Sequence, residues 1–373
     1  MIRFLHLADL HLGWSPSFLQ GDRRTVRQGE RDSLLQRAAD LALQERVDFV
    51  LIVGDLFETH IPDGGIARRA AEQLARLEGG GIRVITVPGN HDEISYHNGI
   101  YRREIDSWPG HLVTNPAPEH CLSFEAAGTP VHLYSMAYTG GVTDVKALSD
   151  LPRCSCEGVH IGAFHGSLDW DAGERSLPLS SRALEAADYH YTALGHIHQH
   201  QVRPVGAGLA CYPGMVEHKS LSEPGVGHFT VVSVRDGQAT LDTPPASVRD
   251  HRRETLDVSS LAGQEDLVAR CLELADPEAV IEMELAGAAP FPISLEQMLE
   301  ALDGQFFHLQ VADRASFIDE VHISRYERER TVRGQFVRDM KAAMDRAECE
   351  ERKKTLGMAL SLGLGAFMKE GSP

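Results

Sequence analysis

Short, mostly apolar runs that end in glycine or in polar residues recur along this chain, and they predict buried β-strands. The five runs are Ile2–Leu7, Phe49–Val53, Ile82–Val87, Val159–Phe164 and Tyr191–Leu194. Because the ends of such strands converge on one rim of a sheet, we expect the polar residues that follow them to lie close together.

The residues that follow these runs are rich in carboxylate, amide and imidazole groups. The seven candidates are Asp9, His11, Asp55, Asn90, His165, His196 and His198. Oxygen and imidazole donors without a thiolate suit Mn, Fe or Zn rather than Ca or a structural zinc. Seven ligands are too many for one ion and suit two, bridged by a carboxylate at about 3.5–4 Å. Asp55 is the candidate bridge.

The pattern between the strands predicts layers of helix and sheet. Residues 31–46 and 65–78 have helical spacing of apolar positions, and each leads into a strand that carries candidate ligands. Three further runs predict hairpin-like pairing in a second sheet: Val131–Met136, His228–Val234 and Ala239–Asp242. Two facing sheets flanked by helices follow from this alternation.

A change in composition at Thr243-Pro244-Pro245 predicts a domain boundary within residues 244–252. Beyond it the chain is expected to alternate β-α-β-α-β through residues 254–311, with Ser294 capping the second helix. From about residue 331 the pattern is helical. The expected division is a main domain at 1–245, a small α+β domain at 250–320 and a helical segment at 325–373. Residues 356–368 would either dock a partner or pack on their own core.

The charge and cysteine content restrict the function. A net charge of −18 argues against tight DNA binding by this chain alone, because phosphate contacts require a basic face. Basic residues cluster near 23–27, 102–103 and 325–341, where each cluster is either a binding surface or a solvated face. Cys154-Ser155-Cys156 is one candidate metal or redox site, but reduced, unpaired cysteines are the preferred interpretation.

The start of the chain enters a strand directly, and no apolar run approaches the roughly 20 residues that span a bilayer. The sequence therefore predicts a cytoplasmic protein without membrane contact.

The order of the polar motifs resembles the calcineurin-like metallophosphoesterases. The motifs are Asp9-x-His11, Gly54-Asp55, Gly89-Asn90-His91-Asp92, His165-Gly166 and Gly195-His196-Ile197-His198. The longer segments that contain these motifs, such as Leu5–Gly13 and Ala193–Gln199, are similar to the corresponding segments of the SbcD-type nucleases. These are the nuclease subunits of the Mre–Rad DNA-repair complexes. Met215-Val216-Glu217-His218 departs from that pattern, which weakens any transfer of DNA contacts.

The resemblance implies a four-layer α/β/β/α sandwich with two divalent ions, expected to be Mn²⁺. One ion would be held by Asp9, His11, Asp55 and His198, and the other by Asp55, Asn90, His165 and His196. His91 is the expected general acid. Glu58, three residues after Asp55, is the expected carboxylate that orients His91, with Asp92 as the rival.

The resemblance further implies a metal-dependent DNA exonuclease of double-strand-break repair, with endonuclease activity as an open question. The implied partners are DNA, a coiled-coil ATPase of the SbcC/Rad type and a second copy of the chain, which would dimerise through helices near 65–78 and 93–107. The residues beyond 250 resemble the capping domain that helps to select DNA. Two alternatives remain: a small-molecule phosphodiesterase or phosphatase of the same superfamily, and a catalytically inactive scaffold.

Overall fold

The computed structural model forms two compact units, Met1–Val248 and Arg249–Pro373. It describes residues 1–140, 148–170, 175–220, 225–246, 248–258, 260–289, 291–317, 320–347 and 349–369. Parts of each expected segment lie outside the described residues: 141–147, 171–174 and 221–224 of the main domain, 247 of the linker, 259, 290 and 318–319 of the small domain, and 348 and 370–373 of the helical segment.

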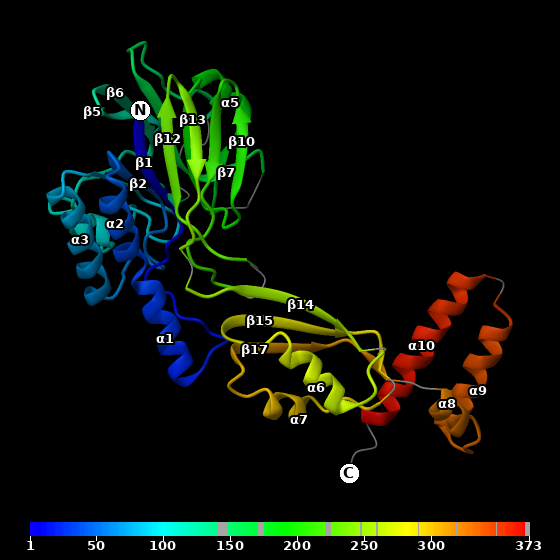
Figure 1. Ribbon diagram of the computed structural model, residues 1–373. Coiled ribbons are helices and arrows are strands. Elements are labelled where there is room, and N and C mark those ends of the chain that lie inside the picture. The colour runs from blue at the N-terminus through cyan, green and yellow to red at the C-terminus, as the bar shows by residue number, and fades with distance from the viewer. Residues whose placement is uncertain are drawn as a thin grey trace. The chain divides into compact units, whose positions relative to one another are not determined.

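The first sheet of the first unit carries the amino-terminal strands (Figure 1). Its order is β13 (Gln238–Asp242), β12 (Thr230–Arg235), β1 (Ile2–Leu7), β2 (Phe49–Val53), β3 (Arg83–Val87) and β4 (His111–Leu112). Strands β1 to β4 run parallel, so their carboxyl ends share one edge. Strand β2 is buried along its whole length, as expected for a continuous apolar run inside a parallel sheet.

The second sheet faces the first. Its order is β10 (Gln201–Val205), β11 (Gly208–Tyr212), β9 (Tyr191–Gly195), β7 (Val159–Leu168), β6 (Thr129–Ser135) and β5 (Glu119–Ala126), with β8 (Leu177–Leu179) paired to β7. Strands β6, β7 and β9 are parallel. Their carboxyl ends therefore also share one edge, and this edge carries His165 and His196.

The predicted hairpin of residues 228–242 forms, but it belongs to the first sheet and not to the second. Strand β12 pairs antiparallel with β1, with Ile2 opposite Val234, and β13 pairs with β12. The sequence does not show which sheet the hairpin joins. In the structure β1 has its parallel partner β2 on one side only. Its other edge accepts the hairpin, which leaves Val131–Met136 as the correct assignment to the second sheet.

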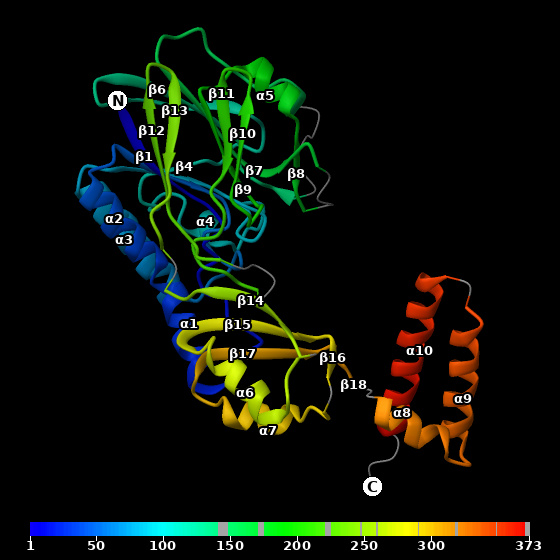
Figure 2. The ribbon, with the colours of Figure 1, turned by 45° about the vertical axis from the view of Figure 1, so that its right-hand side comes forward.

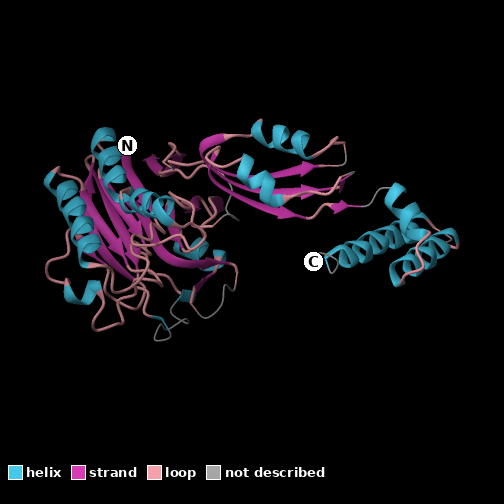
Figure 3. Ribbon diagram, turned by 90° about the horizontal axis from the view of Figure 1, so that it is seen from below, coloured by secondary structure: helices cyan, strands magenta, loops and turns pink. Residues whose placement is uncertain are grey.

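Helices cover the outer faces of both sheets in the first unit, so the layers are α/β/β/α (Figure 3). Helices α2 (Leu34–Glu45) and α3 (Gly64–Gly79) bury apolar side chains on the first sheet. The Asp63 side chain caps α3 by accepting from the backbone N–H of Gly65 at 2.8 Å. Helix α5 (Ser181–Ala187) packs on the outer face of the second sheet. The sequence prediction of this fold class is confirmed.

Helix α1 (Gly21–Asp32) precedes α2, so the helix expected at 31–46 begins instead at residue 34, after Ser33. Arg27 on α1 is buried and donates to the carboxylate of Glu217 at 2.6 Å. Glu217 also accepts from the Val248 N–H at 3.1 Å. Arg27 therefore does not belong to a solvated basic face, and Glu217, one of the residues that departs from the family pattern, has a structural role.

Aromatic rings join the two sheets. Phe4 stacks on Phe49 with ring centroids 4.4 Å apart, and both come from the first sheet. Tyr191 of the second sheet meets Phe4 edge-on at 5.5 Å, and Phe124 meets Phe49 at 5.2 Å. Full burial of a side chain such as Phe4 or Phe49 contributes about 1.5–3 kcal/mol. The core between the sheets thus holds the strand ends of both sheets in a fixed relation.

The second unit contains a small parallel sheet and a group of helices (Figure 2). Strands β14 (His251–Asp257), β15 (Asp276–Ala286) and β17 (Phe306–Asp313) are parallel, and helices α6 (Gln264–Leu272) and α7 (Leu295–Ala301) connect them. Ser294 caps α7 by accepting from the Gln297 N–H at 3.4 Å. The short strands β16 (Ala288–Ala289) and β18 (Ser316–Phe317) also pair.

Helices α8 (Glu320–Glu327), α9 (Val332–Asp345) and α10 (Glu350–Lys369) follow these strands in the second unit. Helix α10 buries Leu360 and Leu364 in a small cluster with Tyr326 and Val337. At least part of α10 therefore packs on its own neighbours. Among the residues that the structure describes, no helix has the length and apolar character needed to cross a bilayer.

The first unit should lose stability below neutral pH because of His6 on β1. Burial, with a smaller contribution from His200, lowers the pKa of His6 to about 3, and its Nδ1 lies 2.9 Å from the Tyr191 hydroxyl. The unfolded chain binds this proton near pH 6.5, so it takes up more protons than the folded chain between about pH 6.5 and 3. The free energy of unfolding should fall by up to about 1.4 kcal/mol per pH unit from this group.

Urea unfolding of the wild type and of His6→Gln between pH 7 and 4 measures this slope. Trp14, Trp108 and Trp170 all lie in the first unit, so tryptophan fluorescence reports on that unit. The variant should show the shallower decline, and identical slopes would contradict the assignment.

Candidate metal centre

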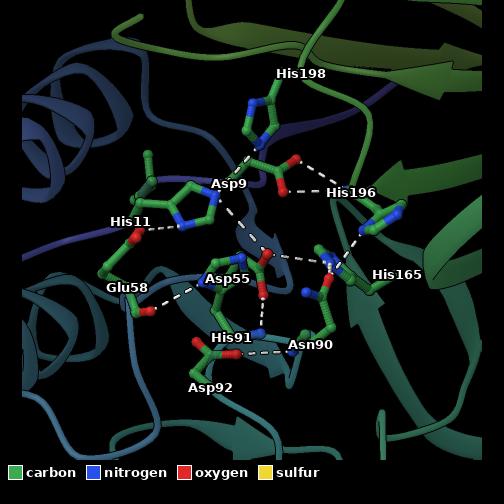
Figure 4. A network of polar contacts seen from close by, with 12 residues as sticks. Asp9, His11, Asp55, Glu58, Asn90, His91, Asp92, His165, His196 and His198 are labelled. Atoms are coloured by element: carbon green, nitrogen blue, oxygen red, sulfur yellow. Dashed lines mark hydrogen bonds and ion pairs between the residues drawn. The ribbon is translucent and has the colours of Figure 1, made fainter. Parts of the chain in front are cut away.

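The structure brings the seven residues singled out from the sequence to one place, at the carboxyl ends of strands from both sheets (Figure 4). The first sheet supplies Asp9, His11, Asp55 and Asn90, which follow β1, β2 and β3. The second sheet supplies His165 from within β7, and His196 and His198 from the turn after β9.

Asp55 lies between two groups of donors. Its Oδ2 is 3.4 Å from His165 Nε2 on one side and 3.8 Å from His11 Nε2 on the other. Its Oδ1 accepts from the backbone N–H of His91 at 2.8 Å, which fixes the carboxylate. This position, in contact with both groups, is the one that a bridging carboxylate requires.

On one side of Asp55, Asn90 and two imidazoles converge. The side-chain oxygen of Asn90 is 2.9 Å from His165 Nε2 and 2.9 Å from His196 Nδ1. His165 Nδ1 donates to the Val53 carbonyl at 2.9 Å, so its Nε2 faces the centre. A backbone carbonyl in this role is the usual partner of a metal-binding histidine.

On the other side, the Nε2 atoms of His11 and His198 are 3.3 Å apart. Asp9 is near both groups: its carboxylate accepts from the His196 N–H at 3.0 Å, and one of its oxygens lies within 4.8 Å of ring nitrogens of His11 and His198. Asp9, Asp55 and His165 form a second convergent group of donors. The two groups share carboxylates, as expected for a pair of ions.

The backbone at the strand ends adopts unusual conformations. Asp9, His11, Asp55 and His196 have positive φ angles of 55°, 48°, 51° and 97°. Such conformations cost on the order of 1 kcal/mol each for a residue other than glycine. Backbone bonds between neighbouring strand ends, Asp9 N–H to Gly54 O at 3.1 Å and His11 N–H to Asp55 O at 2.9 Å, offset this strain.

Two glycines permit the close approach of the groups. A Cβ at Gly54 would lie 2.1 Å from His165 Nδ1, and a Cβ at Gly89 would lie 2.3 Å from Asp55 Oδ1. Gly54 also has φ +81°. Any side chain at either position would displace a candidate ligand, which gives the glycines of the two motifs a direct steric explanation.

The charges in the centre are strongly coupled. Burial alone would raise the pKa of Asp55, but His165 and His11 outweigh it and hold that pKa well below its usual range. Burial lowers the pKa of His165, but Asp55 outweighs it and raises this pKa to about 9. Burial and the charge of His165 lower the pKa of His196 to about 4.

These shifts describe the protein without bound ions and bear on whether the residues fit a metal. Asp55 stays ionised and His196 stays neutral near pH 7, so both retain the lone pairs that a cation needs. The proton on His165 would leave when an ion binds. Buried carboxylates and imidazoles, together with one amide oxygen, are the donors that divalent first-row ions prefer. The residues present fit a pair of such ions.

His91 lies beside the two groups and contacts the backbone of Glu58. His91 Nδ1 lies 2.9 Å from the backbone carbonyl of Glu58. The Glu58 carboxylate is directed to His11 Nδ1 at 2.9 Å and Lys219 Nζ at 2.6 Å. An oxygen of this carboxylate also lies within 4.8 Å of a His91 ring nitrogen, and the orientation of His91 by the Glu58 carboxylate stays a prediction. A carbonyl satisfies the ring N–H, which leaves the carboxylate to hold His11.

Asp92, the rival candidate for orienting His91, makes hydrogen bonds that hold neighbouring turns together. Its carboxylate accepts from the backbone N–H groups of Gly89 at 2.8 Å and Phe57 at 3.1 Å and from the Tyr101 hydroxyl at 2.9 Å. Burial and the nearby charge of Asp55 raise the pKa of Asp92 to about 6. Asp92 thus ties the turn after β3 to the turn after β2 and keeps Asn90 in place.

Sequence reasoning missed two cations at the centre. Lys219 contacts Glu58, and the Arg175 guanidinium donates to the backbone carbonyl of Asn90 at 2.6 Å. Neither lies in a recognisable motif, so only the folded chain shows their position. Arg175 also lines a cavity of about 690 Å³ together with His60, Asn90, His91, Glu93, Tyr96, Tyr138 and Gly140. The candidate centre therefore opens onto a space with room for a substrate.

The fold and this donor set define a metallophosphoesterase. The calcineurin-like phosphoesterase family matches residues 2–200, more than half of the chain. The chain therefore belongs to the calcineurin-like phosphoesterase family, whose members are hydrolases that use divalent metals.

Curated relatives agree with this membership at low identity. The chain is 26% identical over 323 residues to the uncharacterized metallophosphoesterase YhaO of Bacillus subtilis, and the match covers 82% of this chain and 78% of that protein. It is 26% identical over 280 residues to a subunit of the nuclease SbcCD of B. subtilis, covering 64% and 67% of the two chains. It is 26% identical over 241 residues to the DNA double-strand break repair protein Mre11 of Methanococcus maripaludis, covering 60% and 59%.

Asp55→Asn should weaken binding of Mn²⁺ by more than about tenfold, because it removes the charge that contacts both groups of donors. Isothermal titration of the metal-free protein measures the affinity. Asp40→Asn is the matched control, since Asp40 is exposed on α2 and pairs with surface charge at Arg76, 2.7 Å away. If Asp55→Asn bound Mn²⁺ as tightly as this control and the wild type, Asp55 would not be a ligand.

Proposed function

We propose that this chain is a two-metal DNA phosphodiesterase of the SbcD type, with Mn²⁺ as the expected ion. The observation that carries the proposal is the complete donor set, in which Asp55 contacts both groups while His91 stands beside them. The names of two relatives, a nuclease subunit and a DNA double-strand break repair protein, favour DNA as the substrate.

Divalent ions held by the seven residues would activate a water molecule and neutralise charge on the phosphodiester oxygens. The chain's own residues have the tasks of placing the substrate and moving a proton. Arg175 borders the cavity beside Asn90 and is suited to hold a phosphate. His60 and Tyr96, stacked with centroids 3.9 Å apart, offer an aromatic surface on the same cavity.

His91 is the proposed general acid. Because a carbonyl only accepts, the 2.9 Å contact with Glu58 O places a proton on His91 Nδ1. The second ring nitrogen, Nε2, is then the one that gains and releases a proton. Release of this proton from Nε2 to the departing alkoxide would complete the cleavage, since an unprotonated alkoxide is a poor leaving group.

The partners belong to the same proposal. The sheet β14–β15–β17 with α6 and α7 would be the part that selects DNA, and α8–α10 would bind a coiled-coil ATPase. A homodimer through the region of α3 and α4 (Ile100–Arg103) is the proposed assembly. We expect this assembly to act in the cytoplasm on double-strand breaks as an exonuclease, and the same centre could also cut internal phosphodiester bonds as an endonuclease.

One observation favours the alternative of a small-molecule phosphodiesterase. The basic cluster near the C-terminus is partly neutralised within the chain: Arg333 pairs with Glu329 at 2.7 Å and Lys341 with Glu327 at 2.7 Å. Together with the net charge of −18, this lowers the attraction of the single chain for a nucleic acid. An inactive scaffold is disfavoured, since all seven donors and His91 are present.

His91→Ala should reduce turnover by about 10²- to 10⁴-fold, because it removes the proton donor but no proposed ligand. Manganese content after dialysis should stay at the wild-type level. His97→Ala, an exposed histidine six residues further on, is the matched control and should keep full activity. Loss of bound manganese in His91→Ala would show that His91 serves the metals instead.

Purified protein with Mn²⁺ should degrade linear DNA, and Asp55→Asn should abolish this degradation because the ions are no longer held. Gel assays of single- and double-stranded DNA run beside hydrolysis of a small chromogenic phosphodiester. Degradation of both substrates supports the proposal. Hydrolysis of the small diester alone, including after addition of a cognate ATPase subunit, would support the small-molecule alternative.

A further inference from the structure

A second group of metal-binding side chains lies at the other end of β7 from the candidate centre. His132, Cys154 and Cys156 each place a ligand atom within 4.8 Å of the others. His132 belongs to β6, and the two cysteines lie in the segment that leads into β7 at Val159. This group shares no residue with the centre around Asp55.

Three hydrogen bonds fix the backbone of this segment against the second sheet. The Cys154 N–H donates to the Tyr134 hydroxyl at 3.1 Å, and His160 Nε2 donates to the Cys156 carbonyl at 3.0 Å. His132 Nε2 donates to the carbonyl of Glu157 at 3.1 Å. The two thiols are therefore held near His132 by the fold of the segment, which lowers the entropic cost of closing a site there.

The bond to Glu157 also defines the state of His132. Nε2, the ring nitrogen on the side of the cysteine segment, carries the proton in the metal-free protein, and Nδ1 keeps its lone pair. Nδ1 lies 2.8 Å from the Ser123 hydroxyl, which satisfies the lone pair in the metal-free protein. A metal ion bound by Nε2 would take the place of the hydrogen bond to Glu157, and the imidazole proton would then sit on Nδ1, where the Ser123 hydroxyl accepts it.

The donors select a different ion from that of the main centre. Two thiolates and one imidazole form a soft set, which favours zinc over manganese or magnesium. His132 is buried, Cys154 is half-buried and Cys156 is exposed, so the site is open to an ion from solvent. Three protein ligands leave one position of a tetrahedron for water or another donor.

We propose that His132, Cys154 and Cys156 bind one zinc ion, separate from the ions of the phosphoesterase centre. The ion would fasten the segment before β7 to β6. The sequence alone favours unpaired cysteines here, because Cys-x-Cys lacks the second pair of ligands found in zinc motifs. The missing imidazole comes from a neighbouring strand, 22 positions before Cys154, where no local motif includes it.

Zinc content and a cobalt spectrum test the site in the full-length chain. After loading with Zn²⁺ and dialysis, the wild type should retain one more zinc per chain than Cys154→Ser/Cys156→Ser. With Co²⁺ the wild type should show sulfur-to-cobalt charge-transfer absorption in the near ultraviolet, which the double variant lacks. Asp55→Asn should keep this absorption, because its substitution lies in the other centre. Failure of the proposed nuclease function would leave these results unchanged.

Two further variants keep the test decisive. Cys349→Ser, which removes an exposed thiol of the second unit, should retain both the zinc and the absorption. His132→Gln keeps both thiols and should weaken zinc binding, so a folding defect of the double cysteine variant cannot decide the result. Equal zinc content in the wild type and both site variants would overturn the proposal. So would recovery of Cys154 and Cys156 as an intramolecular disulfide in the freshly purified wild type.

Discussion

The contact of His165 with the first sheet is the constraint on which the centre depends. His165 belongs to β7 of the second sheet, yet its Nδ1 donates to Val53 at the end of β2 in the first sheet, 2.9 Å away. This bond directs Nε2 towards Asp55 and Asn90. The two sheets are thereby joined at the point where the candidate ligands from both meet, and Gly54 leaves room for the imidazole.

The aromatic core and the polar centre support one another. Phe4, Phe49 and Tyr191 fix the separation of the two sheets in the interior. The parallel strands then bring their carboxyl ends to one edge, where Asp9 and Asp55 adopt left-handed conformations to turn their carboxylates inward. The energy of the buried core offsets the strain and the buried charge at the edge. A centre with so many charged groups requires a rigid scaffold of this kind.

Electrostatics place different demands on the phosphoesterase centre and on binding of a nucleic acid. The centre acquires local cationic character when ions are bound, whatever the net charge of the protein. Binding a long nucleic acid requires cationic surface beyond the centre, and part of the basic surface expected from the sequence is used internally. Arg27 is buried against Glu217, and Arg333 pairs with Glu329. Not all of the basic residues in the sequence are therefore available to a partner.

The sequence by itself determined the fold class, the strands that carry the candidate ligands and which residues come together at the ends of those strands. The physical reason is local: short apolar runs closed by glycine define strand ends, and parallel strands collect those ends at one edge. Asp55 and Asn90 could be placed in this way without any coordinates. The same pattern also predicted the β-α-β-α-β order at the start of the second unit.

Only the tertiary structure decided relations between segments far apart in the chain. It placed the 228–242 hairpin beside β1, directed the Glu58 carboxylate to His11 and Lys219, and brought His132 to the two cysteines. Each outcome depends on which edge of a strand is free or which buried charge lacks a partner. Free strand edges and unpartnered buried charges arise only when the chain packs in three dimensions, so the periodicity of the sequence cannot predict them.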